Sequence, residues 1–208
     1  MEIENIKTEW VDKYCPKTLK DYVLDPEIKQ YFKNMIKNKN LQNFTLIGCP
    51  GSGKTTLAKV LANEFNAEVL FIKCATEGGV DVLRSKVEPF CNAMTMDGKI
   101  KLVILDELDA ATSTSGSGSS FQMGLRTLIE SAQEDTRFVC TANYNKIIPA
   151  VLSRCPIIPL RFEKKDLLLH VKKILDAEEI KYDRVSLKAF VEEAFRFYPD
   201  IRRIIKYL

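Results

Sequence analysis

Short apolar runs alternate with longer amphipathic stretches along most of the chain. The run at 102–105 shows no polar alternation, which is typical of a strand covered on both faces. Between the runs, apolar residues recur at helical spacing, as at Leu57, Val60, Leu61 and Phe65. Strands that alternate with helices predict an α/β fold with a parallel sheet wrapped by helices. We expect strands at 44–47, 69–72, 102–105, 137–141 and 157–160, with the proline-containing last strand at an edge, and helices at 54–65 and 80–94.

The pattern changes near residues 161–164, after which every amphipathic stretch has helical period and no further strand is predicted. The expected domains are an α/β core at 1–161 and a small helical domain at 162–208. Within the core, residues 112–120 are rich in serine and glycine, which favours a flexible loop. A plain linker and a functional loop are equally compatible with that composition. The expected helices of the second domain are 164–177, 186–197 and 200–208.

Composition narrows the function without fixing it. The 208 residues carry a net charge of +3, which permits nucleic-acid binding but does not require it. The six cysteines show no C-x-x-C spacing and His170 is the single histidine, so a zinc site is not expected. No apolar run approaches the length of a membrane span, and the charged start does not resemble a signal peptide. A cytoplasmic protein without membrane partners is expected.

A glycine-rich loop follows the first expected strand, where residues 48–55 read Gly-Cys-Pro-Gly-Ser-Gly-Lys-Thr. Such a loop turns its backbone N–H groups toward phosphate oxygens, and the helix after it adds the positive end of its dipole. Lys54 is expected to reach the β- and γ-phosphates of ATP, and the Thr55 hydroxyl to hold Mg²⁺. A chance match in this length has a probability on the order of one percent. The residues expected to contact the nucleotide are Gly48, Pro50, Gly51, Ser52, Gly53, Lys54, Thr55 and Thr56.

Two further strand ends carry polar residues. Asp106 and Glu107 directly follow the third strand, where ligands of α/β sheets bind. Asp106 is expected to bind the metal and the nucleotide, and Glu107 to activate the attacking water. Because Asp109 follows closely, a solvated acidic turn is the alternative. Asn143 ends the fourth strand and can donate to the γ-phosphate or the attacking water, unless it serves only as a turn residue.

Three segments then resemble one family in order and spacing. The segment 10–21, the triplet Ser153-Arg154-Cys155 and the segment 198–203 are similar to an N-terminal motif, the S-R-C motif and the second sensor of sliding-clamp-loader ATPase subunits. These subunits belong to the AAA+ P-loop ATPases. The resemblance spans nearly the whole chain and is strongest to the loaders of T4-like bacteriophages and, more broadly, to replication factor C small subunits. It implies a five-stranded parallel sheet followed by a helical lid domain.

The resemblance assigns roles that residue chemistry alone leaves open, since isolated arginines are mostly solvated surface groups. It places Tyr14 and Pro16 at the adenine, makes Asn143 the first sensor and makes Arg202 the lid sensor. Arg154 becomes a catalytic finger for the site of an adjacent subunit. The resemblance also implies roles in DNA binding. Gln122 is expected to couple DNA binding to Glu107, and Arg84 and Lys86 are expected to contact DNA. A solvated helix face is an equally good interpretation of Arg84 and Lys86.

The implied function is ATP-driven opening of a sliding clamp and its loading on primer–template DNA by a hetero-pentameric ring. Cys15 departs from the family, which usually has arginine there, and the chain stops at Leu208 inside the lid, before the collar domain. A truncated form and a naturally short form both fit that end. Alternatives are another AAA+ motor, such as a branch-migration helicase or helicase loader, and a ring subunit that binds nucleotide without hydrolysis. The expected location is the cytoplasm, of the host cell if the protein is viral.

Overall fold

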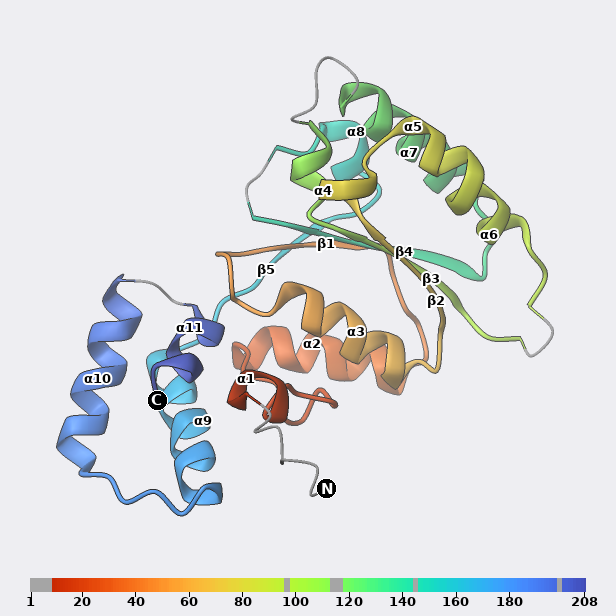
Figure 1. The fold of residues 1–208 in the computed structure, drawn as a ribbon. Coiled ribbons are helices and arrows are strands. Elements are labelled where there is room, and N and C mark those ends of the chain that lie inside the picture. The colour runs from red at the N-terminus through yellow and green to blue at the C-terminus, as the bar shows by residue number, and fades with distance from the viewer. Residues whose placement is uncertain (1–8, 96–97, 113–117, 144–145, 198–199) are drawn as a thin grey trace, which may run out of the picture.

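The computed structural model describes residues 9–95, 98–112, 118–143, 146–197 and 200–208. Its centre is a five-stranded parallel sheet with the order β2-β3-β4-β1-β5 (Figure 1). The α/β prediction, the number of strands and the edge position of the last strand are confirmed. The strands are β1 Phe44–Ile47, β2 Glu68–Lys73, β3 Lys101–Asp106, β4 Thr136–Ala142 and β5 Ile157–Pro159.

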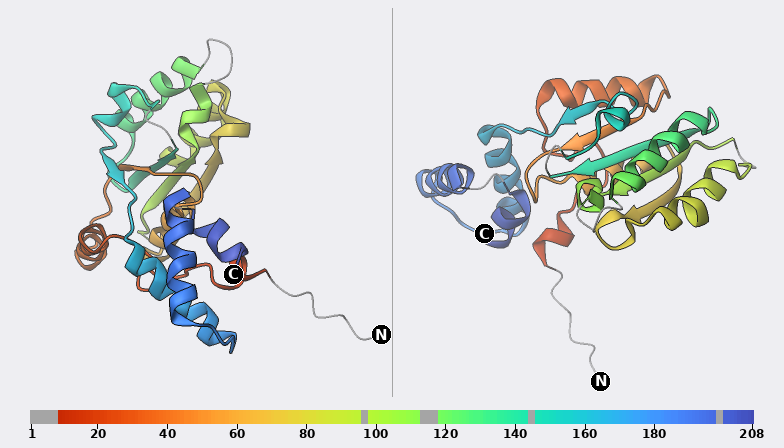
Figure 2. Two further views of the ribbon diagram at one scale, coloured as in Figure 1. Left: turned by 90° about the vertical axis from the view of Figure 1, so that its left-hand side faces the viewer. Right: turned by 90° about the horizontal axis from the view of Figure 1, so that it is seen from above.

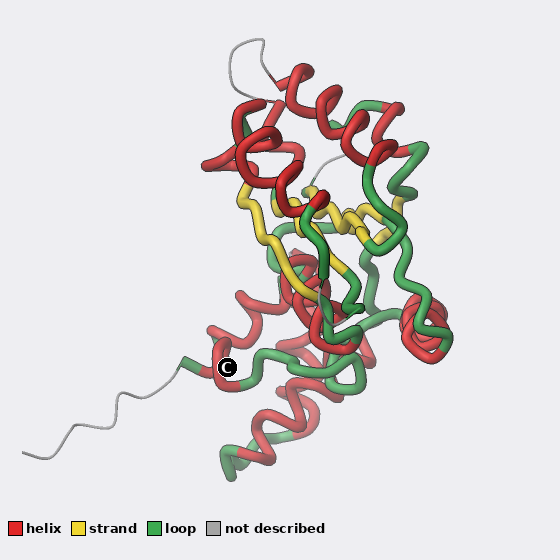
Figure 3. The backbone as a smooth tube through the Cα atoms, turned by 90° about the vertical axis from the view of Figure 1, so that its right-hand side faces the viewer, coloured by secondary structure: helices red, strands yellow, loops and turns green. Residues whose placement is uncertain are grey.

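Helices cover both faces of the sheet, which is why the interior strand β3 is buried along its whole length (Figures 1 and 3). On one face, Phe32, Phe44 and Leu57 belong to one apolar cluster; on the other, Phe121 and Phe138 belong to a second. The first face carries α2 Pro26–Lys37 and α3 Lys54–Glu64. The second carries α4 Cys74–Glu77, α5 Val80–Val82, η1 Leu83–Val87, α6 Glu88–Asn92, η2 Leu108–Thr112, α7 Gly118–Ser131 and α8 Pro149–Leu152.

Two local features depart from the sequence expectations. The helix expected at 80–94 consists of α5, a π-helical turn η1 and α6. Pro89 has no N–H to donate to the carbonyl four residues earlier, and its ring crowds that carbonyl, so wider π-type bonding there has a physical cause. Helix α2 was not predicted, although Asp25 caps it by accepting from the N–H groups of Glu27 and Ile28 and Pro26 opens it.

The non-helical part of the serine-rich segment is shorter than the sequence predicts. Helix η2 extends to Thr112 and α7 begins at Gly118, so both ends of the expected loop 112–120 are helical. Its centre, 113–117, lies outside the described residues. Within the part of the chain that is described, no helix is long and apolar enough to cross a bilayer.

The last three helices form a group of their own, set to one side of the sheet (Figure 2). They are α9 Lys164–Ala177, α10 Arg184–Phe197 and α11 Ile201–Lys206. Their apolar cluster consists of Leu167, Val171, Leu175, Leu187, Val191 and Ile204. Trp10 of the short helix α1 Trp10–Lys13 packs against it. Helix α1 therefore packs against α11, and the two together border the glycine-rich loop.

Candidate active site

The glycine-rich loop between β1 and α3 adopts a conformation that only glycine accommodates well. Gly51 and Gly53 have φ values of +74° and +89°. A Cβ at Gly53 would lie 2.3 Å from the Tyr22 hydroxyl, and one at Gly51 would lie 1.8 Å from the carboxylate of Asp200. Because Gly53 is also the N-cap of α3 and makes no side-chain cap, the first N–H groups of this helix are left for another acceptor.

Lys54 at the start of α3 is folded back over the loop. Its Nζ donates to the carbonyl oxygens of Gly48 and Cys49, both at 2.9 Å, and only 7% of the residue is exposed. Burial lowers the pKa of its ammonium, while nearby acidic groups such as Asp109 and Asp106 act in the opposite direction. The structure thus holds a buried cation beside a turn of backbone donors, which is the chemistry that a polyphosphate needs.

The carboxylate of Asp106 at the end of β3 joins three elements. Its Oδ1 accepts from the Thr55 hydroxyl of α3 at 2.6 Å and from the Thr141 hydroxyl of β4 at 2.7 Å. The Thr141 oxygen in turn accepts from the backbone N–H of Glu107 at 3.0 Å. The sequence predicts the meeting of Thr55 with Asp106 but not the role of Thr141. The only sequence signal for Thr141 is its position near the end of β4, the strand next to β3.

Glu107 and Asn143 border one cleft of about 130 Å³, lined also by Lys54, Thr55, Thr141 and Arg202 and by the loop residues Pro50, Gly51, Gly53 and Thr56. Glu107 has a φ of +55°, a left-handed conformation that is costly for a residue with a Cβ. The Asn143 backbone N–H donates to the largely buried Asp109 at 3.1 Å. Asp109 therefore holds the backbone at Asn143. The alternative of a solvated acidic turn does not describe Asp109, because this side chain is largely buried.

A larger cleft of about 340 Å³ adjoins the first, between the beginning of the chain, the loop and the last helices. Tyr14 and Pro16, the two residues expected at the adenine, both line this cleft, and Arg202 lines both clefts. The Tyr14 hydroxyl donates to Glu178 at 2.6 Å, and this bond is the main reason that its pKa is raised. The segment around residues 198–199, part of the expected second sensor, lies outside the described residues.

Two further residues of this cleft were not predicted. Tyr22 is 4% exposed, and its hydroxyl donates to the backbone oxygen of Ser52 at 3.2 Å. This bond holds the glycine-rich loop against the segment that precedes α2. His170 of α9 also lines the cleft, and burial lowers its pKa, which favours the neutral ring at pH 7. Neither belongs to a motif, so only the folded chain brings them to the site.

The chemistry of this site suits ATP with Mg²⁺. The Ser52 hydroxyl is buried and has no hydrogen-bond partner among the described residues. A bound phosphate would supply the missing partner. Among those residues no group of three or more His, Cys, Asp or Glu side chains forms a metal cage. One carboxylate beside one threonine hydroxyl is instead the sparse set that Mg²⁺ uses when phosphate oxygens and water complete its shell. Thr55 and Asp106 therefore fit the metal.

Arg154 does not reach either cleft of its own chain. It follows α8, and its guanidinium donates to the Ala150 carbonyl at 2.7 Å and pairs with Glu130 of α7. Arg84 and Lys86 lie on the exposed face of the turn η1, where Lys86 pairs with Glu77. Gln122 is fully buried and bonds the backbone at residues 146 and 148. These residues lie apart from the nucleotide clefts.

A glycine-rich loop after β1, carboxylates after β3 and a polar end of β4 on a doubly wound sheet define a P-loop nucleoside triphosphatase. The model of the family "ATPase family associated with various cellular activities (AAA)" matches residues 44–161. This chain belongs to the AAA ATPase family.

Similar curated proteins include the replication factor C small subunits of Staphylothermus marinus, Thermofilum pendens and Methanococcus vannielii. Each is 35% identical over 209 aligned positions that cover 96% of this chain. These alignments cover 60%, 61% and 63% of the relatives, so the chain spans about three fifths of their length.

Solved structures share the fold at lower identity. The Thermotoga maritima RuvB Holliday junction branch migration motor superposes with a TM-score of 0.68 at 18% identity, covering 93% of this chain and 63% of that chain. A RuvB variant from the same organism gives a TM-score of 0.69 at 16% identity, again covering 93% and 63%. At such identities the likeness concerns the fold.

Proposed function

We propose that this chain is an ATPase subunit of a sliding-clamp loader, which uses ATP binding and hydrolysis to open a clamp and load it on primer–template DNA. The observation that carries the proposal is the 35% identity to replication factor C small subunits across 96% of the chain, with Ser153-Arg154-Cys155 outside its own clefts. Partner subunits, the clamp and primed DNA are the proposed partners. The finer assignments are a hetero-pentameric ring, a T4-like bacteriophage origin and the cytoplasm of a host cell.

In this proposal the adenosine occupies the larger cleft between Tyr14, Pro16 and Arg202, and the triphosphate follows the loop to Thr55 and Thr56. Lys54 exchanges the carbonyls of Gly48 and Cys49 for phosphate oxygens. Thr55 and Asp106 would hold Mg²⁺, and the ion would neutralise the negative charge that develops during phosphoryl transfer.

The residues that directly follow β3 and β4 act on the attacking water. Glu107 accepts a proton from the attacking water, because it lines the cleft with Lys54 and Asn143 and its backbone is fixed by Thr141. The amide of Asn143 orients the γ-phosphate or that water. Arg202 adds a positive charge from the lid side, and Arg154 adds one to the site of the neighbouring subunit.

The test is ATP hydrolysis by the chain alone and by the ring reconstituted from its partner subunits, each with and without clamp and primed DNA. We expect little turnover from the chain alone, because Arg154 serves another subunit's site, and strong stimulation of the ring by clamp and DNA together. ATP binding without stimulated turnover supports a structural ring subunit instead. Clamp-independent strand displacement or branch migration supports the other AAA+ motors.

Replacing Thr141 by valine tests how the Glu107 turn is held. The change keeps shape but removes an acceptor from the Glu107 N–H and a donor from Asp106. Leaving such groups unpaired costs about 1–3 kcal/mol, so we expect lower stability in denaturant unfolding and slower hydrolysis. Thr136→Val is the control, because this buried threonine starts the same strand far from the cleft. Equal turnover in the two variants contradicts the role of Thr141.

A further inference from the structure

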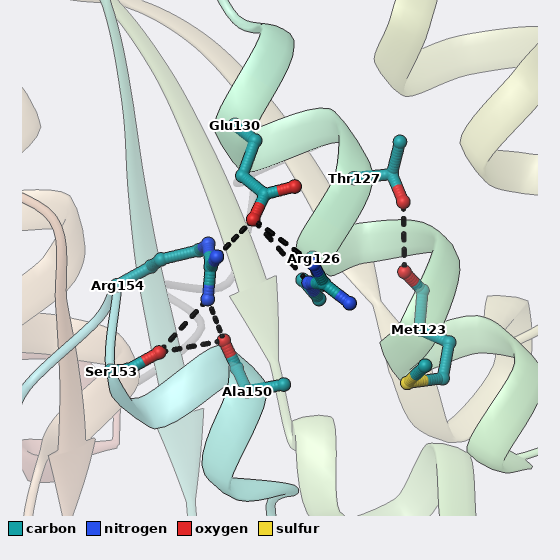
Figure 4. A network of polar contacts seen from close by, with 7 residues as sticks. All are labelled: Met123, Arg126, Thr127, Glu130, Ala150, Ser153 and Arg154. Atoms are coloured by element: carbon teal, nitrogen blue, oxygen red, sulfur yellow. Dashed lines mark hydrogen bonds and ion pairs between the residues drawn. The ribbon is translucent and has the colours of Figure 1, made fainter.

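Arg154 takes part in a network of polar contacts between α7 and the turn after α8 (Figure 4). Its Nη1 donates to the Ala150 carbonyl at 2.7 Å and to the Ser153 hydroxyl at 2.9 Å. Its Nη2 donates to Oε1 of Glu130. The Ser153 hydroxyl also donates to Ala150 at 3.0 Å, so the turn itself is tied down. The guanidinium is thus held from two sides by its own chain.

Part of the guanidinium nevertheless remains available. An arginine has five N–H donors, and the three contacts above use three of them. For Nε and the second proton of Nη2, the described residues supply no acceptor. The side chain of Arg154 is 30% exposed. Two donors can therefore meet oxygen atoms of another molecule while Glu130 and Ala150 keep the group in place.

The net charge of this network is positive, although the network includes the Glu130 carboxylate. Oε1 of Glu130 accepts from Arg154 and also, at 3.4 Å, from Nε and Nη2 of Arg126, one helical turn earlier on α7. Two guanidinium groups share one carboxylate, which gives the three side chains a net charge of +1. A lone arginine–glutamate pair would be neutral and would attract a phosphate group less strongly.

We propose that Glu130 is a positioning residue for the Arg154 finger, an inference that rests on the trans role of Arg154 in the proposed function. Glu130 fixes the guanidinium before subunits meet, so less rotamer freedom is lost when the finger reaches the neighbour's γ-phosphate. Arg126 offsets the charge of Glu130, so that positioning does not cancel the attraction. The three side chains act together as a preset anion receptor at the subunit edge.

The experiment compares steady-state ATP hydrolysis of reconstituted rings, with clamp and primed DNA, in which this chain carries Glu130→Gln or Glu134→Gln. Glutamine keeps the shape but replaces a charge-assisted hydrogen bond by a neutral one. We expect the kcat of the Glu130→Gln ring to fall about tenfold with an unchanged KM for ATP. Glu134 is an exposed carboxylate just after α7, and its replacement should change neither constant. An unchanged kcat for Glu130→Gln overturns the proposal.

A double variant separates positioning from a general structural role. When Arg154→Ala is already present, Glu130→Gln should have no further effect on turnover, because there is no finger left to position. A further loss in that background overturns the proposal, since Glu130 would then act through something else. If Arg154→Ala alone leaves stimulated turnover unchanged, it is the trans finger of the proposed function that fails, whatever Glu130 does.

Discussion

A Glu107→Gln chain should bind ATP as tightly as the unmodified chain, while hydrolysis by its ring should fall about 10²–10⁴-fold, the range that a general base contributes. Glutamine keeps the size of the side chain and its place in the cleft beside Lys54 and Asn143, but it takes no proton from water. The contacts expected to hold the phosphates, Lys54 and the loop, are untouched. Nucleotide titration gives the affinity, and phosphate release with clamp and primed DNA gives the turnover.

The backbone of Glu107 makes this variant informative. Its φ of +55° is held by the bond from its N–H to Thr141, and glutamine meets the same conformational cost as glutamate. Glu107→Gln should therefore unfold at the same denaturant concentration as the original chain. A Glu107→Gln ring that hydrolyses ATP at the original rate would show that another group activates the water.

The sequence was sufficient for the parts of the fold that depend on local pattern. The apolar run of β3 has no polar alternation because both faces are covered, so it could be recognised without any partner. Helix α2 was not predicted, although Asp25 and Pro26 are ordinary start signals for a helix. The π-helical turn before Pro89 needs backbone bonding that no periodicity reports.

At the candidate site, the sequence predicts the residues that belong to recognisable motifs. It does not predict the residues that reach the site only through the folding of the chain. Lys54, Thr55 and Asp106 come together as expected from strand ends at one edge of the sheet. Thr141 and Tyr22 act through bonds to backbone groups far away in the chain. Such contacts depend on which strands are neighbours, and the order β3-β4-β1 is a tertiary property that a single sequence does not state.

The arrangement of the arginines explains why one chain is an incomplete enzyme in this proposal. Arg202 lines both clefts from the lid, whereas Arg154 lies with α7 and α8 on the other side of the sheet. In this proposal Arg154, which lines neither cleft, does not stabilise the transition state at its own chain's site. It can do so only for a second subunit, which makes hydrolysis depend on assembly.

Arg154→Ala should therefore leave ATP binding by the chain unchanged and lower clamp- and DNA-stimulated hydrolysis of the ring by about 10³-fold, the lower end of the effect of an arginine finger. Arg196→Ala, which removes an exposed arginine of α10, should leave turnover unchanged. Where copies of this chain are neighbours, mixing Arg154→Ala with Lys54→Ala chains should restore part of the hydrolysis, since one supplies the phosphate loop and the other the finger. If the mixture stays as inactive as each variant alone while both still assemble, Arg154 does not act between these copies.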